Sequence, residues 1–165
     1  MARRDTEGEV KLSLLDRLID QDPKSRTEAT PSRSQTLREL KASLKRDIEW
    51  LLNTRRYEEL VLKDSHELPQ SLVGYGLPDI CSVATHSAND QKQLLWKMEA
   101  AITNFEPRLE SVKISLEPVG QGARMLRFVI EGYLRVDPVP EHISFDTLLE
   151  LTSGEYQVRG DDHAR

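Results

Sequence analysis

Three consecutive residues, Glu106, Pro107 and Arg108, are the first candidates for binding or catalysis. They lie between a helix-like pattern and a strand-like pattern. Proline alone explains the end of the helix, because it lacks an N–H group and moves the preceding residue out of the α region. The two charges are additional. Glu106 lies at a predicted helix C-terminus, where the helix dipole disfavours an acid, so we expect a cation nearby.

Two interpretations of this triplet are open. In an extended chain, residues i and i+2 point to the same side, so Glu106 and Arg108 could contact each other over Pro107 as a local ion pair. An exposed pair of this kind contributes at most about 1 kcal/mol. Alternatively, the same charges face a partner protein. The residues alone favour neither interpretation.

Enzyme chemistry has little support in the sequence. A glycosidase needs a protonated acid and an ionised carboxylate about 5 to 9.5 Å apart, and we find no second carboxylate to pair with Glu106. Aromatic residues make up only 5% of the chain, and the four histidines and Cys81 do not fall at metal-ligand spacing. We therefore expect no catalytic residues, no metal, no cofactor and no small-molecule substrate.

Composition limits the class of protein further. A chain of 165 residues with 38% hydrophobic residues predicts one core, and a net charge of −5 without a basic block argues against nucleic acid as a partner. The single cysteine suits a reducing compartment. No apolar run reaches the roughly 20 residues of a membrane span, and the first residues lack a signal-peptide pattern. We expect a cytoplasmic protein without membrane insertion.

Hydrophobic periodicity predicts an α+β fold. Apolar residues at steps of three and four predict helices over 36–53 and from Asp90 to Phe105, each beginning with a capping box. After Pro107 the period changes to two, which predicts three antiparallel strands. The expected architecture is two main helices packed on a three-stranded antiparallel β-meander. Trp96 is expected in the core, and Tyr75, in a glycine-flanked turn, on a contact surface.

Three domain segments are predicted. Residues 1–34 form an N-terminal arm with a short amphipathic helix and a linker, residues 35–160 form the main domain, and residues 161–165 form a disordered tail. Leu15 and Leu18 lie on the apolar stripe of the short helix. Such a helix is marginal alone, so the arm either packs on the domain or becomes ordered on a partner.

The last predicted strand contains Leu148 and Leu149 and lies at an edge of the meander. An unprotected edge can accept a strand from another chain. We therefore expect Leu148 and Leu149 to bind a partner.

Four segments together resemble the TssE family of type VI secretion baseplate subunits: "SLLDRLID", "LKRDIEWLLNTRR", "SLVGYGLPDI" and "FEPRL". This family is similar to the wedge protein of contractile phage tails that starts the sheath. One departure is Gly74, where the family pattern has an asparagine. The resemblance implies a non-enzymatic baseplate-wedge subunit, and it favours the interpretation of Glu106, Pro107 and Arg108 as a partner-binding site.

The resemblance also implies specific partners. These are the wedge proteins TssF, TssG and TssK and the sheath proteins TssB and TssC, met at the cytoplasmic face of the inner membrane. Two alternatives stay open. Family members are sometimes labelled lysozyme-like, which suggests a peptidoglycan hydrolase, and a cytoplasmic anti-adaptor protein is said to share this fold.

Overall fold

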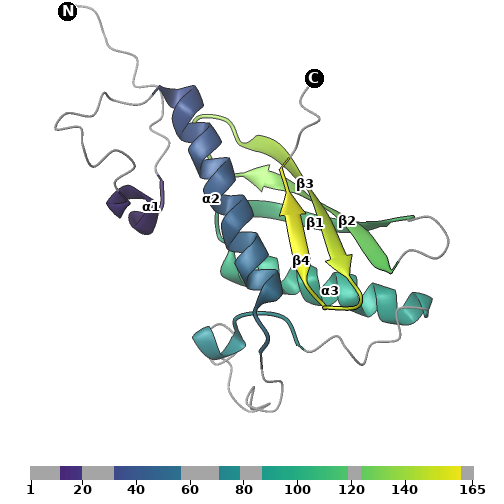
Figure 1. Cartoon of the computed structure of the whole chain (residues 1–165). Coiled ribbons are helices and arrows are strands. Elements are labelled where there is room, and N and C mark those ends of the chain that lie inside the picture. The colour runs from purple at the N-terminus through teal and green to yellow at the C-terminus, as the bar shows by residue number, and fades with distance from the viewer. Residues whose placement is uncertain (1–11, 20–31, 57–70, 79–86, 119–123, 161–165) are drawn as a thin grey trace, which may run out of the picture.

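The computed structural model describes residues 12–19, 32–56, 71–78, 87–118 and 124–160. Their elements, shown in Figure 1, are α1 (Leu14–Leu18), α2 (Arg33–Asn53), the 3-10 helix η3 (Leu72–Gly74), α3 (Ala88–Phe105), β1 (Leu109–Glu117), β2 (Met125–Leu134), β3 (Glu141–Glu150) and β4 (Tyr156–Arg159). The predicted tail, most of the linker and Cys81 lie outside these residues. The predicted domain boundary at residue 35 stays a prediction.

The four strands form one antiparallel sheet in the order β1-β2-β3-β4. Phe128, Thr147 and Val158 lie opposite one another on neighbouring strands, and all three are buried. Residues directly opposite each other share a face of the sheet. The other face, which carries Arg127 and Gln157, is half-buried or exposed. The helices therefore cover one face, which confirms the predicted α+β class.

The core lies between that inner face and the two long helices. α2 lies closest to β4 and α3 lies closest to β1 (Figure 1). Their apolar stripes supply fully buried side chains, among them Leu44, Ile48, Leu52, Met98 and Ile102. The helical periodicity thus identified the faces that pack against the sheet.

Both long helices begin earlier than predicted. The hydroxyl of Ser32 accepts a hydrogen bond from the N–H of Gln35 and caps α2, and the hydroxyl of Ser87 caps α3. The predicted capping box at Thr36 is wrong, because Thr36 lies inside α2 and donates its hydroxyl to the carbonyl of Ser32. A serine upstream offers the same capping chemistry at an earlier turn. The predicted end of α3 at Phe105 is confirmed.

The prediction of three strands is wrong, because the last predicted strand is two strands. After Glu150 the chain turns through residues 151–154 and returns as β4. Gly154 has φ 70, and its N–H donates to the carbonyl of Glu150 at 2.8 Å. Glycine adopts this conformation without a steric penalty.

The fourth strand removes Leu148 and Leu149 from the edge of the sheet. Leu148 is paired with Gln157, and Leu149, which is 2% exposed, is paired with Tyr156. The predicted strand addition at these two leucines is therefore wrong in its premise. Leu149 belongs to the core, and Leu148 lies half-buried on the outer face.

The edge strands β1 and β4 are partly covered by side chains of the helices. On β1, the N–H of Ile114 donates to the carboxylate of Glu99 at 2.9 Å. On β4, the amide of Asn53 accepts from the N–H of Tyr156 and donates to its carbonyl, both at 2.8 Å. These contacts occupy backbone groups that would otherwise be open to another strand.

The placement of Trp96 in the core is wrong as well. Trp96 is 67% exposed, beside the buried stripe of α3 rather than on it, and Trp50 on α2 is 61% exposed. Both rings belong to the surface of the molecule.

The contacts of Asn53 lead to a prediction on stability. Asn53→Ala should lower the free energy of unfolding by about 1–3 kcal/mol, because the backbone N–H and carbonyl of Tyr156 lose their partners. Urea denaturation measures the change. The control is Gln157→Ala, at an exposed position of β4 next to Tyr156. This variant should unfold like the unchanged protein. Equal stability of the two variants would contradict the role of Asn53 at this edge.

Candidate functional site

The junction between α3 and β1 is tied down through its backbone. The N–H of Glu106 still donates to Ile102 of α3, and the N–H of Leu109 donates to the carbonyl of Glu106. The carbonyl of Arg108 accepts from the N–H of Arg135 at 2.8 Å. Ser111, with φ 53, lies where the pairing register of β1 shifts, so the strand bends just after the junction.

Arg108 connects this junction to α2. Its Nε donates to Glu106 Oε1 at 2.6 Å and its Nη2 to Glu106 Oε2 at 2.5 Å, which makes a bidentate pair. The same Nη2 donates to Asp47 Oδ2 at 2.6 Å, and Nη1 donates to the hydroxyl of Ser43 at 3.2 Å. Hydrogen bonds to Glu106, followed by those to Asp47, raise the pKa of Arg108 although burial opposes them.

Glu106 therefore has the cation that its position requires. Glu106 is only 5% exposed, so its ion pair with Arg108 differs from an exposed surface pair, which would stabilise the fold only weakly. A buried carboxylate left without a partner is strongly destabilising. The structure shows the local ion pair directly, and a partner-binding role of Glu106, Pro107 and Arg108 stays a prediction.

The ion pairs continue from the junction to α1. Arg46 donates to Asp47 and to Asp16, each at 2.9 Å, and Ser43 donates to Asp16 at 2.5 Å. Burial opposes the ionised form, but hydrogen bonds from Ser13, Ser43 and Arg46 outweigh it and lower the pKa of Asp16 to about 2. Acids and arginines alternate along this chain of contacts. We call it the charge network, defined as Asp16, Ser43, Arg46, Asp47, Glu106 and Arg108.

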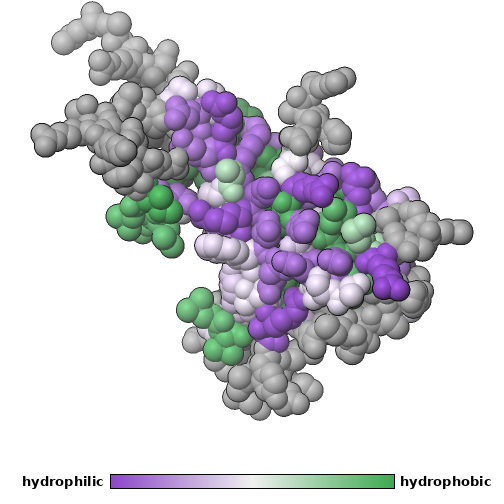
Figure 2. Space-filling view, in the orientation of Figure 1, coloured by the Kyte–Doolittle hydropathy of each residue, from purple (hydrophilic) through white to green (hydrophobic). Residues whose placement is uncertain are grey.

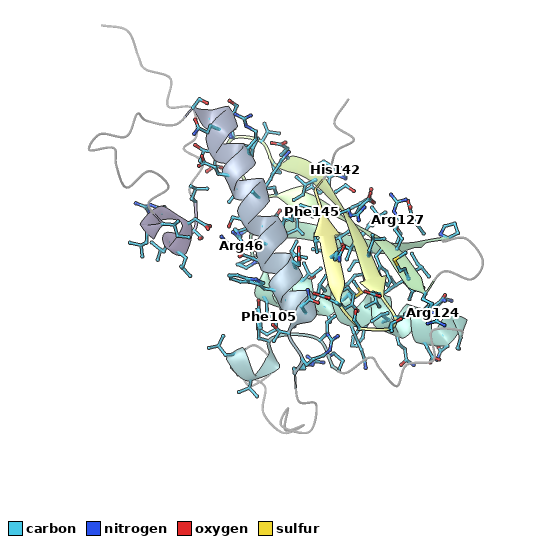
Figure 3. All side chains as sticks on the ribbon, viewed as in Figure 1. Arg46, Phe105, Arg124, Arg127, His142 and Phe145 are labelled. Atoms are coloured by element: carbon cyan, nitrogen blue, oxygen red, sulfur yellow. The ribbon has the colours of Figure 1, made fainter. Side chains whose placement is uncertain are left out.

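A pocket of about 330 Å³ lies at one end of the charge network. Its wall consists of Asp47, Ile48, Leu51, Tyr75, Phe105, Glu106, Pro107 and Arg108. The ring of Tyr75 packs edge-on against Phe105, with centroids 5.2 Å apart. In Figure 3, Phe105 lies near the C-terminal end of α2, and Arg46 lies on α2 itself, nearer the middle of the helix.

The chemistry of this pocket suits recognition of a protein surface. Burial, followed by the negative charges of Asp47 and Glu106, raises the pKa of Tyr75. Its hydroxyl therefore lies within the field of both carboxylates. Ile48, Leu51 and Phe105 give the pocket an apolar lining, and Asp47, Glu106 and Arg108 add charged groups to it. Protein interfaces combine an apolar core with polar groups in the same way.

The structure brings together four of the predicted site residues and separates the rest. Tyr75 lies in the same pocket as Glu106, Pro107 and Arg108. The predicted leucines of the arm lie on α1, where Leu15 is 69% and Leu18 is 83% exposed. In the described part of the chain, Asp16 joins their helix to the charge network, which leads to the pocket.

Sequence reasoning missed the residues of α2 in the charge network. Ser43 and Asp47 each directly precede a core residue of the apolar stripe, Leu44 and Ile48. The signal in the sequence is this position: a small polar and an acidic residue, one turn apart, directly beside the apolar stripe. The structure shows that Ser43 is indeed only 7% exposed.

Hydrolysis is not favoured by this geometry. Asp47 is a second carboxylate beside Glu106, which the sequence did not reveal. However, Arg108 is bonded to both oxygens of Glu106, and Glu106 is only 5% exposed, whereas the two carboxylates of a glycosidase must flank the sugar bond that is cleaved. Within the described ranges, no three His, Cys, Asp or Glu side chains are placed to hold a metal ion. In the same ranges, no helix is long and apolar enough to cross a membrane.

Comparison with known proteins defines the class. The family model "Baseplate wedge protein gp25" matches residues 38–139, which is more than half of the chain and runs from within α2 to the connection between β2 and β3. The chain therefore belongs to the gp25 family of baseplate wedge proteins. This confirms the resemblance to the TssE family, whose members are homologues of gp25.

A solved structure is also similar. It is a chain of "The baseplate complex from the type VI secretion system", with 18% sequence identity and a TM-score of 0.48 over 67% of this chain and 94% of that chain. No curated protein matches the sequence.

The buried ion pair leads to a prediction for Arg108. Arg108→Ala should lower the free energy of unfolding by about 3 kcal/mol, because Glu106 is left buried without a counter-charge. The double variant Glu106→Gln with Arg108→Ala should recover part of the loss, since the unpaired charge is gone. Thermal and urea unfolding measure both effects.

The control for Arg108 is Arg135. Its pair with Glu110 is exposed, with 67% and 44% of the two side chains accessible. Arg135→Ala should cost less than about 1 kcal/mol. If Arg108→Ala lowers the free energy of unfolding no more than Arg135→Ala does, Arg108 does not hold Glu106 and Asp47 in solution.

The lowered pKa of Asp16 predicts a pH dependence of α1 docking. The pKa is about 2 in the folded chain and roughly 3.9 in an unfolded one. A depressed carboxyl pKa stabilises docking above about pH 4, and this contribution is lost as the pH falls toward 2. NMR shifts of the α1 amides should report release in that window.

Asp16→Asn is the matched variant for this titration. Its α1 amides should show the released position at neutral pH and little change on acidification. An unchanged α1 in Asp16→Asn, or docking that persists at pH 2 in the unchanged chain, would remove Asp16 as the tether.

Proposed function

We propose that this chain is a structural subunit of a type VI secretion baseplate, which joins the baseplate wedge and starts the sheath. The observation that carries the proposal is the gp25 family match across the segment that holds Asp47 and the Glu106–Arg108 junction. Its partners are the wedge proteins TssF, TssG and TssK and the sheath proteins TssB and TssC. In this proposal the baseplate lies at the cytoplasmic face of the inner membrane.

The pocket beside the junction is the proposed contact with the wedge. The ion pairs of Arg108 fix the shape of the pocket, because Arg108 is bonded to both Glu106 and Asp47 before any partner binds. A pre-organised surface loses little conformational entropy on binding. About a quarter of the side chains of Arg108 and Asp47 is still accessible. Together with Tyr75 and Pro107 they form the surface that a partner meets.

The proposed contact with the sheath uses a different part of the sheet edge from the one predicted. β4 pairs with β3 only from Asp146 to Leu149. The preceding part of β3, which includes His142 and Ser144, has no described strand on that side. A sheath strand could extend the sheet there, with backbone hydrogen bonds for affinity and alternating side chains for register.

The alternatives rest on less. A glycosidase needs two carboxylates that reach the sugar, whereas Glu106 is buried with both oxygens bonded to Arg108. For the anti-adaptor, no feature of the described residues indicates a sequestered protein. A structural, non-enzymatic role agrees with the family. It also agrees with the ion pairs of the site, in which Glu106 and Asp47 are both bonded to Arg108.

The test is capture of the wedge subunits by the full-length chain. Co-expressed TssF and TssG should co-purify with the unchanged chain, and Tyr75→Ala should reduce capture at least tenfold by removing an aromatic wall of the pocket. Trp96→Ala, an exposed aromatic on α3 outside the pocket, is the control and should bind normally. Thermal melting of each variant verifies its fold.

Two results would contradict the proposal. Failure of the unchanged chain to capture TssF, TssG or TssK would remove the baseplate role. Equal capture by folded Tyr75→Ala and by Trp96→Ala would keep the role and move the contact away from the pocket.

A further inference from the structure

We propose that α1 and the neighbouring face of α2 form a second binding surface, which takes an acidic amphipathic helix of another baseplate subunit. We call it the α1–α2 ridge, defined by Leu14, Leu15, Arg17, Leu18, Lys45, Arg46 and Trp50. It rests on the proposed function only in that the partner belongs to the baseplate. It is separate from the pocket, whose wall contains none of these residues.

The first observation is that α1 is held by its polar side. The carboxylate of Asp16 accepts hydrogen bonds from Ser13, Ser43 and Arg46. The leucines point the other way: Leu14 is 76% exposed, and Leu15 and Leu18 are exposed to a similar extent.

This orientation is opposite to that of a helix that packs for its own stability. A surface helix normally turns its apolar stripe toward the core, and a helix of five residues is not stable alone. The ion pairs therefore hold α1 in a position that presents its leucines outward. Figure 2 shows this apolar group at α1 beside a largely hydrophilic α2 surface.

The second observation is that Arg46 joins α1 to an exposed aromatic ring. One Nη atom of Arg46 contacts Asp16, and its guanidinium carbon lies 5.3 Å from the centroid of Trp50. Beside them is a shallow pocket of about 280 Å³, lined by Ala42, Lys45, Arg46, Glu49 and Trp50. Tryptophan and arginine are the residue types that most often dominate protein–protein binding energy.

The third observation is the local charge, which specifies the partner. The ridge carries the cations Arg17 and Lys45, while the charge of Arg46 is compensated by Asp16 and Asp47. The whole chain, by contrast, has a net charge of −5. Glu49 is the acid that lines the shallow pocket, and the side chain of Asp16 is only 11% exposed because it faces α2.

A cationic rim around leucines and a tryptophan fits a helix with one apolar face and acidic flanks. A second copy of this chain, with its net negative charge, is the competing occupant. The experiment separates the two.

The first arm of the test maps the contact directly. A photo-crosslinking amino acid replaces Leu18 in the full-length chain, which is co-expressed with TssF, TssG and TssK. The control carries the same probe in place of Trp96, which is 67% exposed on α3 and lines neither pocket. We expect the Leu18 probe, and not the Trp96 probe, to react with a helical segment of a wedge subunit that is apolar on one face and rich in Asp and Glu beside it.

Three outcomes of this arm overturn the proposal. They are a crosslink to a second copy of this chain, a crosslink to a segment without excess acid, and no crosslink above the level of the Trp96 control.

The second arm measures affinity for the captured subunit. Leu15→Asp combined with Leu18→Asp, and Lys45→Glu, should each weaken binding at least tenfold, and binding should weaken as salt increases. Trp50→Ala should weaken it where Trp96→Ala does not. Each substitution lies on the surface, so thermal melting should show a normal fold.

The two binding sites can be told apart. If the ridge variants bind like the unchanged chain while Tyr75→Ala does not, the ridge is wrong and the proposed function stands. If the unchanged chain captures no wedge subunit at all, both are wrong.

Discussion

The structure depends on one partly buried interaction, the contact of Arg108 with Glu106 and Asp47. Proline at position 107 ends α3, and the carboxylate that precedes it is buried against the core. Arg108 compensates that charge and, through Asp47, fixes the junction of α3 and β1 against α2. The same contacts position the pocket at the junction and, through Arg46, the short helix α1. Two arginines, Arg108 and Arg46, thus connect three segments that are far apart in the sequence.

Local sequence patterns predicted much of the fold. They failed where the chain changes direction but the alternation of apolar residues continues. Helical spacing identified the faces of α2 and α3, and proline identified the end of α3. The fourth strand was missed because the alternation of apolar residues continues through Leu149 and Leu151, although the chain already turns after Glu150. Only "TSG" marked the reversal. Trp96 was misplaced because its size suggested burial, whereas its angle on α3 keeps it outside the stripe.

The candidate site was predicted only in part for a related reason. Glu106 and Arg108 are close in sequence, so their pairing followed from backbone geometry. The choice of Ser43 and Asp47 as partners depends on how α2 crosses the end of α3, which no local spacing encodes. The outward orientation of Leu15 and Leu18 likewise depends on a tertiary contact, that of Asp16. Their roles in binding, and those of Glu106, Pro107 and Arg108, stay predictions.

The most direct measurement is an experimental structure of the full-length chain within an assembled wedge complex. It should show a side chain of a wedge subunit seated against Tyr75 and Pro107, with Arg108 still paired to Glu106 and Asp47 inside the chain. A structure in which the pocket faces solvent, or in which Arg108 leaves Glu106 to pair with a carboxylate of the partner, would contradict this account.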